Sequence, residues 1–375
     1  MKLEQISTLL NNTIVPNYLG QETTIATDLS NVVDLGQAIA DIDADTVKDF
    51  AKAFVVGVAR NYFDDRMYER VDYGLFNDFR EYGGVLQRVK AKLIDAEDSP
   101  IWTLENGQNY FDGTYHEVET DVKIYSKDTI FMVVNSIPTE MWKQSFMSAD
   151  GVSSLIAMIE SRVESSVNIK LNALAKSIFQ QMIVSASEDR NIHLLTLYNT
   201  LAGTSLTAGE ALNNAPFLRW SAQQIVRLRD MITVYNDKYN DGTIETFTPK
   251  ADTRVTLLTE FATSIQFNMQ SDTFNKDMVE IGKFNTIPFW QNQSKDLLPS
   301  LGVTAEVKTT DGENESTVSG VVGIIHDRMS GGMTARLEKT TADYIPKGDF
   351  TNYFTHIGTS RFVDTRNSAI VLSLT

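Results

Sequence analysis

The chain of 375 residues contains no cysteine and only four histidines. The absence of cysteine excludes disulfides, thiolate nucleophiles and zinc or iron–sulfur sites built from cysteine. The histidines stand far apart, at His116, His193, His326 and His356, and none has a second histidine at the spacing of metal ligands. We therefore interpret them as ordinary strand or surface residues.

Long apolar runs are also missing. No run approaches the roughly 20 apolar residues of a membrane-spanning helix. The first residues, MKLEQISTLLNNTIVPNYLG, lack the apolar stretch and small-residue cleavage site of a secretory signal. The sequence therefore predicts a soluble protein that is made inside the cell and has no membrane partner.

Positive charge is in deficit, because 33 Lys and Arg residues face 49 Asp and Glu residues, for a formal net charge of −16. Electrostatic capture of nucleic acid needs clustered Lys and Arg, so the balance argues against a nucleic-acid-binding protein. It does not argue against a protein that encloses DNA without gripping it.

Motifs for chemistry are absent as well: there is no GxGxxG, no Walker lysine loop and no GxSxG elbow. Asp41, Asp43 and Asp45 imitate the start of a calcium loop, but Thr46 stands at the required glycine and Lys52 at the required glutamate. We predict no catalytic residues, no cofactor and no metal site, and no enzyme activity. An α+β enzyme with an unrecognised site stays open as an alternative, because sites assemble from distant residues.

What the sequence does contain is a charge-alternating ribbon within residues 83–134. The first arm is apolar on one face and basic on the other: Val89, Ala91 and Leu93 alternate with Arg88, Lys90 and Lys92. The second arm is mostly apolar on one face and mostly acidic on the other: Val118, Thr120, Val122 and Ile124 alternate with Glu117, Glu119, Asp121 and Lys123. Such alternation is typical of half-exposed strands. Antiparallel pairing would set opposite charges across the ladder. Because an isolated ribbon is marginal in water, we expect it to lie on another copy of the chain.

The ribbon tip, over residues 96–115, is rich in Asp, Gly and Asn but also carries aromatic residues. Two interpretations stay open: these aromatics cover their own ribbon, or they contact another subunit. The predicted intersubunit contacts are Arg88, Lys90, Lys92, Trp102, Tyr110, Phe111, Glu117, Glu119 and Asp121.

A very long amphipathic helix is predicted over residues 151–187, which contain no proline and no internal glycine. Apolar residues recur in steps of three and four, at Val152, Leu155, Ile159, Val163, Val167, Leu171, Leu174, Ile178 and Met182. Ser148 or Asp150 is the expected N-cap. The steps of four are too frequent for a strict heptad, which disfavours a coiled coil.

The remaining elements indicate an α+β protein without internal repeats. Helices are predicted over 46–61, 75–82, 221–239 and 260–267. Strands are predicted over 130–134, 255–258, 284–290, 321–325, 335–338, 353–357 and 369–374, of which those over 130–134 and 255–258 are expected to be buried. A surface loop is predicted over 309–319.

Three segments carry a resemblance to a known family: FDGTYHEVETDVKIY, SSLIAMIESRVESSVNIKLNALAKSIFQQMI and GTSRFVDTRNSAIVLSL. Together with the order of parts, they resemble the HK97-like major capsid proteins of tailed bacteriophages, in particular the coat proteins of small short-tailed phages. The resemblance implies an HK97-like fold. Its parts would be an N-terminal arm (1–45), peripheral-domain helices (46–82), an extended loop (83–134), a peripheral domain with a spine helix (135–216, spine 151–187), an axial domain (217–336) and C-terminal strands that return to the peripheral domain (337–375).

The resemblance also implies the function: a coat protein that self-assembles into hexamers and pentamers of an icosahedral or prolate shell around the phage genome. The expected location is the virion, and the host cytoplasm during assembly. Expected partners are further copies of the chain, a separate scaffolding protein, a portal protein and double-stranded DNA held without specific recognition. No lysine–asparagine cross-link is expected. An encapsulin-like compartment shell of the same fold is the alternative.

Overall fold

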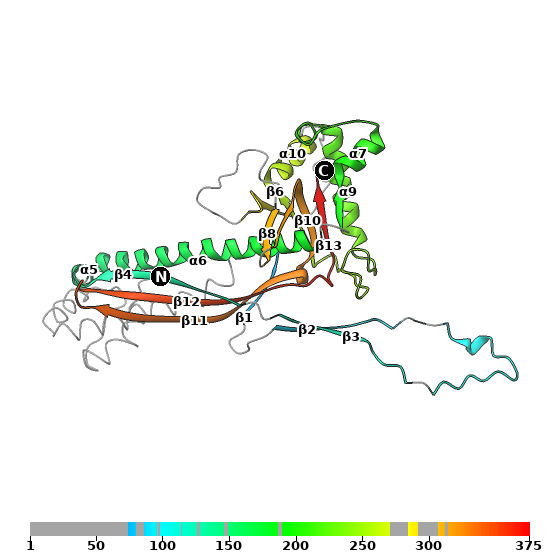
Figure 1. The fold of residues 1–375 in the computed structure, drawn as a ribbon, viewed down its shortest axis with the longest axis horizontal. Helices are drawn as coiled ribbons and strands as arrows, with labels where there is room; N and C mark the ends of the chain where they lie inside the picture. The colour runs from blue at the N-terminus through cyan, green and yellow to red at the C-terminus, as the bar shows by residue number, and fades with distance from the viewer. Residues whose placement is uncertain are drawn as a thin grey trace.

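The computed structural model describes residues 74–79, 86–94, 96, 98–113, 115–125, 128–145, 149–186, 190–270, 284–291, 307–311 and 314–375. The expected N-terminal arm and the helix over 46–61 lie outside these residues. Figure 1 shows three regions: an elongated part in which the long helix α6 (Ala149–Ala186) follows a long sheet, a compact part with a second sheet and short helices, and a loop that projects from their junction.

The spine helix α6 confirms the prediction of one long helix. Its 38 residues give a length of about 57 Å at 1.5 Å per residue. The predicted apolar stripe is buried at every position from Leu155 to Met182. The helix begins at Ala149, so Asp150 lies inside it and is not its N-cap, while Ser148 lies outside the described residues.

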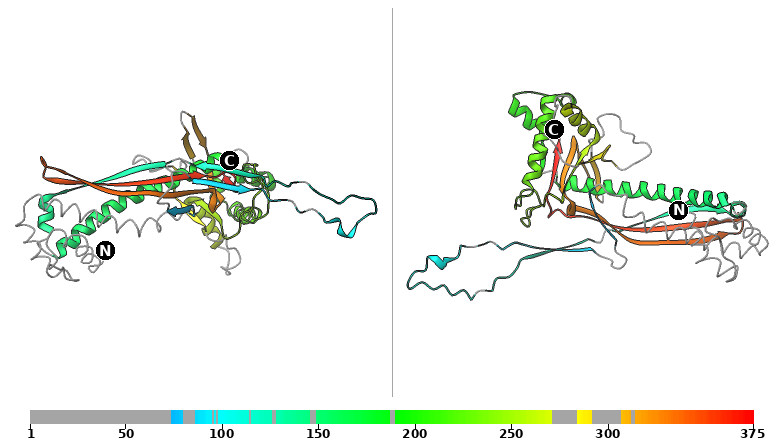
Figure 2. Two further views of the ribbon diagram at one scale, coloured as in Figure 1. Left: turned by 90° about the horizontal axis from the view of Figure 1, so that it is seen from below. Right: turned by 180° about the vertical axis from the view of Figure 1, so that it is seen from behind.

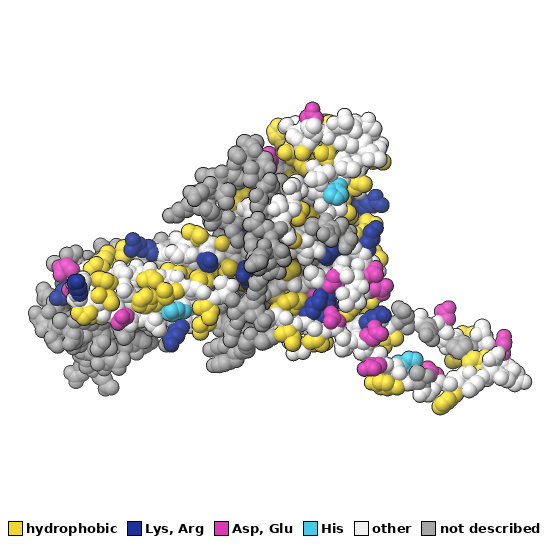
Figure 3. Space-filling view, in the orientation of Figure 1, with side chains coloured by type: hydrophobic (Ala, Val, Ile, Leu, Met, Phe, Trp, Pro, Cys, Tyr) yellow, Lys and Arg dark blue, Asp and Glu magenta, His cyan; other side chains and the backbone are white. Residues whose placement is uncertain are grey.

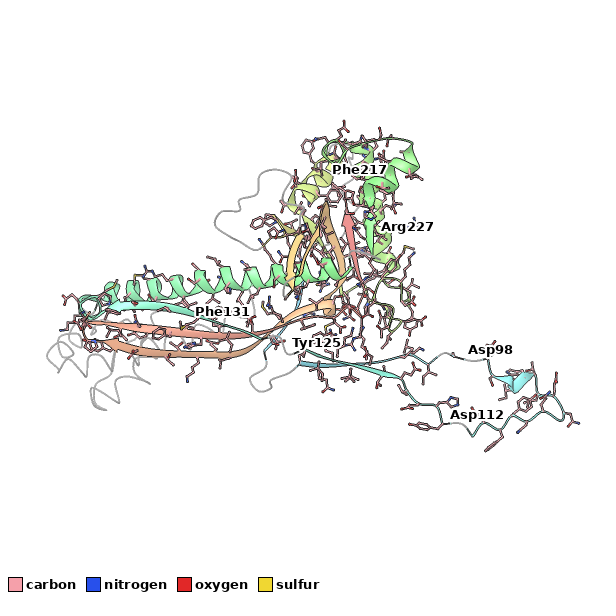
Figure 4. All side chains as sticks on the ribbon, viewed as in Figure 1. Asp98, Asp112, Tyr125, Phe131, Phe217 and Arg227 are labelled. Carbon is pink, nitrogen blue, oxygen red and sulfur yellow. The ribbon has the colours of Figure 1, made fainter. Side chains whose placement is uncertain are left out.

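The elongated part rests on a four-stranded sheet of order β1-β11-β12-β4. Its strands are β1 (Phe76–Phe79), β11 (Gly331–Ile345), β12 (Phe350–Val363) and β4 (Asp128–Pro138). One face packs on α6 (Figures 1 and 2). Ile357 belongs to the same hydrophobic core as the helix stripe, Phe131 and Val133 pack against that core, and Figure 4 marks the position of Phe131 on β4. At Gly331 a Cβ atom would lie 2.7 Å from Ile178 Cγ2, so glycine lets the start of β11 approach the helix closely.

Two predictions fail in this sheet. The helix expected over 75–82 is wrong, because residues 76–79 form β1, which pairs parallel with β11 some 250 residues away. Such long-range pairing overrides local helix propensity. The strand over 130–134 is confirmed, but it is not buried, since Ile130 is 64% exposed and Met132 and Val134 point to the same open face.

The compact part is built on a five-stranded sheet of order β5-β13-β10-β6-β7. Its strands are β5 (Asn191–His193), β13 (Ala369–Ser373), β10 (Val321–Asp327), β6 (Thr253–Leu258) and β7 (Asn285–Ile287). Its helices are α7 (Leu194–Ala202), α8 (Ala208–Ala211), α9 (Ala215–Met231) and α10 (Thr259–Gln270), and the short helix α5 (Thr139–Ser145) precedes α6. The central strands β10 and β13 are buried at every residue, which explains their continuous apolar sequence.

Several boundaries differ from the predicted ones. Helix α9 begins before residue 221 and ends at Met231 instead of near 239. The predicted surface loop over 309–319 is wrong, because it forms the hairpin β8 (Val307–Asp311) and β9 (Asn314–Val318), where buried Val307 pairs with Val318. Of the two C-terminal strands, β12 lies beside β4, whereas β13 lies in the five-stranded sheet. The domain boundaries themselves stay a prediction.

Candidate assembly interface

The loop that projects from the junction, called here the projecting loop, comprises residues 86–125. Its root is the antiparallel pair β2 (Leu86–Ala91) and β3 (Thr120–Tyr125). Beyond the root, the described residues hold no further strand and only one short 3₁₀ turn, at Pro100–Trp102. In Figure 4, Asp98 and Asp112 mark the two arms far from the body, and Tyr125 lies at the root.

The expected charge pairing across the ladder is confirmed in part. Lys90 faces Asp121 in the register, and Lys92 Nζ lies 3.5 Å from Glu119 Oε2 beyond the last pair. Arg88, however, faces Lys123, so the expectation of opposite charges is wrong there. Arg88 and Lys123 can face each other because each forms an ion pair with a carboxylate of the body. Arg88 pairs with Asp364 at 3.1 Å, and Lys123 pairs with Asp241 at 2.9 Å.

The root is fixed by a charged network that we name the root cluster: buried Asp364 and Arg366 with partly buried Arg88 and Asp121. Arg366, whose side chain is fully buried, donates from Nε and Nη2 to the two oxygens of Asp364, both at 2.9 Å. Its Nη1 donates to the carbonyl and the carboxylate of Asp121, at 2.9 and 3.1 Å. Its Nη2 also lies 3.3 Å from the carbonyl of Arg88. One guanidinium therefore contacts both arms of the loop.

Asp364 and Arg366 keep their charges in the folded chain. Burial alone would raise the pKa of Asp364, but hydrogen bonds from Arg366 and the charge of Arg88 outweigh it and hold that pKa below its ordinary value. Burial likewise opposes the charge of Arg366, but Asp364 raises the pKa of that guanidinium above its ordinary value. Next to the cluster, Lys90 Nζ donates to the carbonyl of Arg366 at 3.0 Å, and burial lowers its pKa.

The tip presents apolar side chains to solvent. Trp102 is 93% exposed and Phe111 83% exposed, and Tyr115 is exposed to a similar degree. Tyr110 is less exposed, and its hydroxyl accepts a hydrogen bond from the Glu105 amide at 2.8 Å. The interpretation that these aromatics cover their own ribbon therefore does not fit the three exposed rings.

The predicted contact residues thus fall into two groups. Arg88, Lys90 and Asp121 lie at the root, where they already bind groups of their own chain. Lys92, Trp102, Tyr110, Phe111, Glu117 and Glu119 lie farther out and are exposed. Sequence reasoning missed Asp364 and Arg366. Their only local signal is a polar DTRNS turn between two strands, which does not say that the turn receives the loop.

A second exposed apolar surface lies on the four-stranded sheet, on the face away from α6. Ile130, Met132 and Val134 alternate along β4, opposite Gly358, His356 and Phe354 of β12. Leu337 of β11 continues the row, because it pairs with Gly358. Figure 3 shows hydrophobic side chains on the elongated part and again along the projecting loop. A soluble monomer rarely leaves two such surfaces uncovered.

Comparison with known proteins agrees with the resemblance described from the sequence. Residues 10–372 match the family described as Phi29-like phage major capsid protein. None of the curated proteins matches the chain. None of the helices in the described residues has the length and apolar character to cross a membrane.

A solved phage structure shares the fold, and other phage capsid structures are more distantly similar. A chain in the structure of the head fiber and inner core protein gp22 of native bacteriophage P68 is 12% identical, covers 82% of this chain and 84% of that chain, and has a TM-score of 0.51. The capsid structure of Staphylococcus phage Andhra gives 11% identity, 82% and 84% coverage and a TM-score of 0.48. That of the Cyanophage P-SCSP1u gives 12% identity, 80% and 86% coverage and a TM-score of 0.44.

Proposed function

This chain belongs to the Phi29-like phage major capsid protein family, and we propose that its projecting loop straps each subunit to a neighbouring copy in the capsid shell. The protein is a capsid shell subunit with the HK97-like α+β fold, as the sequence resemblance implied. Nothing in the comparisons favours the encapsulin alternative. A structural role in a shell requires large contact surfaces and no reaction centre.

The exposed tip carries this proposal. Trp102 and Phe111 lie at the end of a loop whose ladder is only six residues a side. Because both rings are exposed, they add little to the folding stability of their own chain. Trp, Tyr and Arg are enriched among the residues that dominate binding energy at protein interfaces, and Phe is enriched in the buried core of interfaces. Burial against a neighbour would stabilise the contact by about 25 cal/mol per Å² of apolar surface.

The open face of the four-stranded sheet is the receiving surface that we propose. Ile130, Met132 and Val134 offer a flat apolar row, and Lys339, which pairs with His356 on the same face, adds positive charge. The outer loop is acidic, with Asp98, Glu105, Glu117 and Glu119 exposed. A mixed apolar and electrostatic fit would set the position of the loop on its neighbour.

The finer partners stay proposals. We expect hexamers and pentamers of this chain, a separate scaffolding protein, a portal protein and packaged double-stranded DNA, with assembly in the host cytoplasm before the protein resides in the virion. The formal net charge of −16 supports DNA held without tight binding, since an acidic wall would not retain phosphates. The two sheets support a peripheral and an axial unit, and in chain order the projecting loop lies between β1 and β4 of the four-stranded sheet.

The test is a double substitution at the tip, Trp102→Ser with Phe111→Ser. Both side chains are exposed, so the melting temperature and circular dichroism of the free subunit should stay unchanged. The yield of closed shells, counted by electron microscopy with the neighbouring phage genes co-expressed, should fall at least tenfold. The matched control, Trp102→Phe with Phe111→Tyr, keeps the aromatic surface and should assemble normally. Wild-type shell yield from the serine variant would refute the strap.

A further inference from the structure

The direction of the projecting loop cannot come from the loop itself. An isolated two-stranded ribbon is marginally stable in water. The ladder here is six residues a side, and beyond it only one backbone hydrogen bond, from Lys92 N to Glu119 O at 2.9 Å, joins the two arms among the described residues. A loop of this kind would swing about its root unless the root is attached firmly to the body.

Lys123 ties the second arm to the body at Asp241 and Thr365, but Arg366 contacts both arms. It stands in the turn that joins β12 to β13, which is the crossing from the four-stranded to the five-stranded sheet. From this turn it donates to the second arm at Asp121 and lies within hydrogen-bond distance of the first arm at the Arg88 carbonyl. Its own carbonyl accepts from Lys90. Contacts to both arms resist rotation, whereas contacts to one arm would leave a hinge.

The chemistry of the root cluster makes this attachment specific to one pose. Arg88 Nη1 also donates to the Met329 carbonyl at 2.6 Å and meets Asp364 at 3.1 Å. If the loop swung away, Asp364 and Arg366 would keep each other, but Asp121 and Arg88 would lose their partners together. Charge-assisted hydrogen bonds are about twice as strong as neutral ones, and a guanidinium fork fits only one geometry.

We propose that Arg366 is a positioning residue for shell assembly: through Asp121 and the Arg88 carbonyl it holds the projecting loop of the free subunit in one direction, so that the tip reaches its neighbour already oriented. This inference rests on the proposed strap function of the loop. It adds that the strap is oriented before contact and that the body, not the partner, sets the direction. A pose populated one tenth of the time would weaken apparent assembly about tenfold.

The absence of cysteine gives a clean test. Spin labels are attached to Asn106→Cys at the tip and Thr263→Cys on α10, both exposed positions, and the distance distribution is measured in unassembled subunits by pulsed electron resonance. Asp121→Asn removes the loop-side charge and leaves the Asp364–Arg366 pair intact. Arg366→Lys keeps the positive charge but cannot contact both arms. Glu119→Gln is the control, because Glu119 lies two residues away in the same arm and its side chain forms an exposed pair with Lys92, while the backbone bond from Lys92 is untouched.

We expect one narrow distribution in the wild type and the control, and a broad one in Asp121→Asn and Arg366→Lys. Shell formation should slow about tenfold in both variants and recover with subunit concentration, whereas the tip variant should not recover. Narrow distributions in Asp121→Asn would overturn the inference even if Arg366→Lys failed to fold. Broad distributions together with wild-type assembly would also overturn the inference about Arg366. In that case the proposed strap function would still hold if the tip variant fails to assemble.

Discussion

The most demanding prediction concerns His326, a histidine buried at the centre of the five-stranded sheet. Its Nδ1 lies 2.9 Å from the Asp327 carbonyl, to which it donates, and its ring packs edge-on against Phe179 of the spine helix. Its Nε2 is buried and has no hydrogen-bond partner among the described residues. A proton added to Nε2 would therefore sit in an apolar contact without an acceptor.

The size of the effect follows from the pKa. Burial lowers the pKa of His326 from 6.5 to about 4; the Asp327 carbonyl opposes the change and Arg254 adds to it. Because the folded-state pKa is lower than the unfolded one, the unfolded chain binds the proton first. Stability is complete above pH 6.5 and is lost as the pH falls toward 4, by about 3 kcal/mol at 1.36 kcal/mol per pKa unit.

Urea unfolding of the unassembled subunit from pH 7 to pH 4 measures this loss. The carboxylates titrate in every variant, so the difference between wild type and His326→Gln isolates the histidine. That difference should change by about 3 kcal/mol over the range, with the glutamine variant the less sensitive to acid. The control His116→Gln, at an exposed loop position, should follow the wild type. Parallel curves for wild type and His326→Gln would refute the reasoning.

Three further substitutions test the packing and the root. Asp364→Ala leaves two guanidinium groups without their buried carboxylate and should cost about 3–5 kcal/mol in unfolding free energy; a loss below 1 kcal/mol would show that the root cluster is not buried in solution. Gly331→Val places a side chain where Ile178 Cγ2 lies 2.7 Å from the Cβ position and should cost about 1–3 kcal/mol, whereas Gly209→Val, where nothing lies within 4 Å, should not share this steric penalty. Ile178→Ala should cost about 2–5 kcal/mol by leaving a cavity under the sheet, and Ile169→Ala on the exposed side of the same helix should change unfolding by less than about 1 kcal/mol.

The elements that sequence predicted well are those written in local periodicity. The stripe from Leu155 to Met182 specified one long helix, because residues three and four apart share a face. Alternation specified the ribbon in the same way, because successive strand residues point to opposite sides. The order of these parts was enough for the resemblance to HK97-like capsid proteins, which the family match confirms.

Tertiary structure alone decided which distant segments meet. Residues 76–79 became a strand because β11 offered a free edge, and residues 309–319 became a hairpin because Val307 could be buried. No local pattern shows that Arg366 lies against Asp121, 245 residues earlier. Such long-range contacts are stabilised by burial and charge pairing that exist only in the folded chain. The sequence gives the residue types that take part, but not which of them meet.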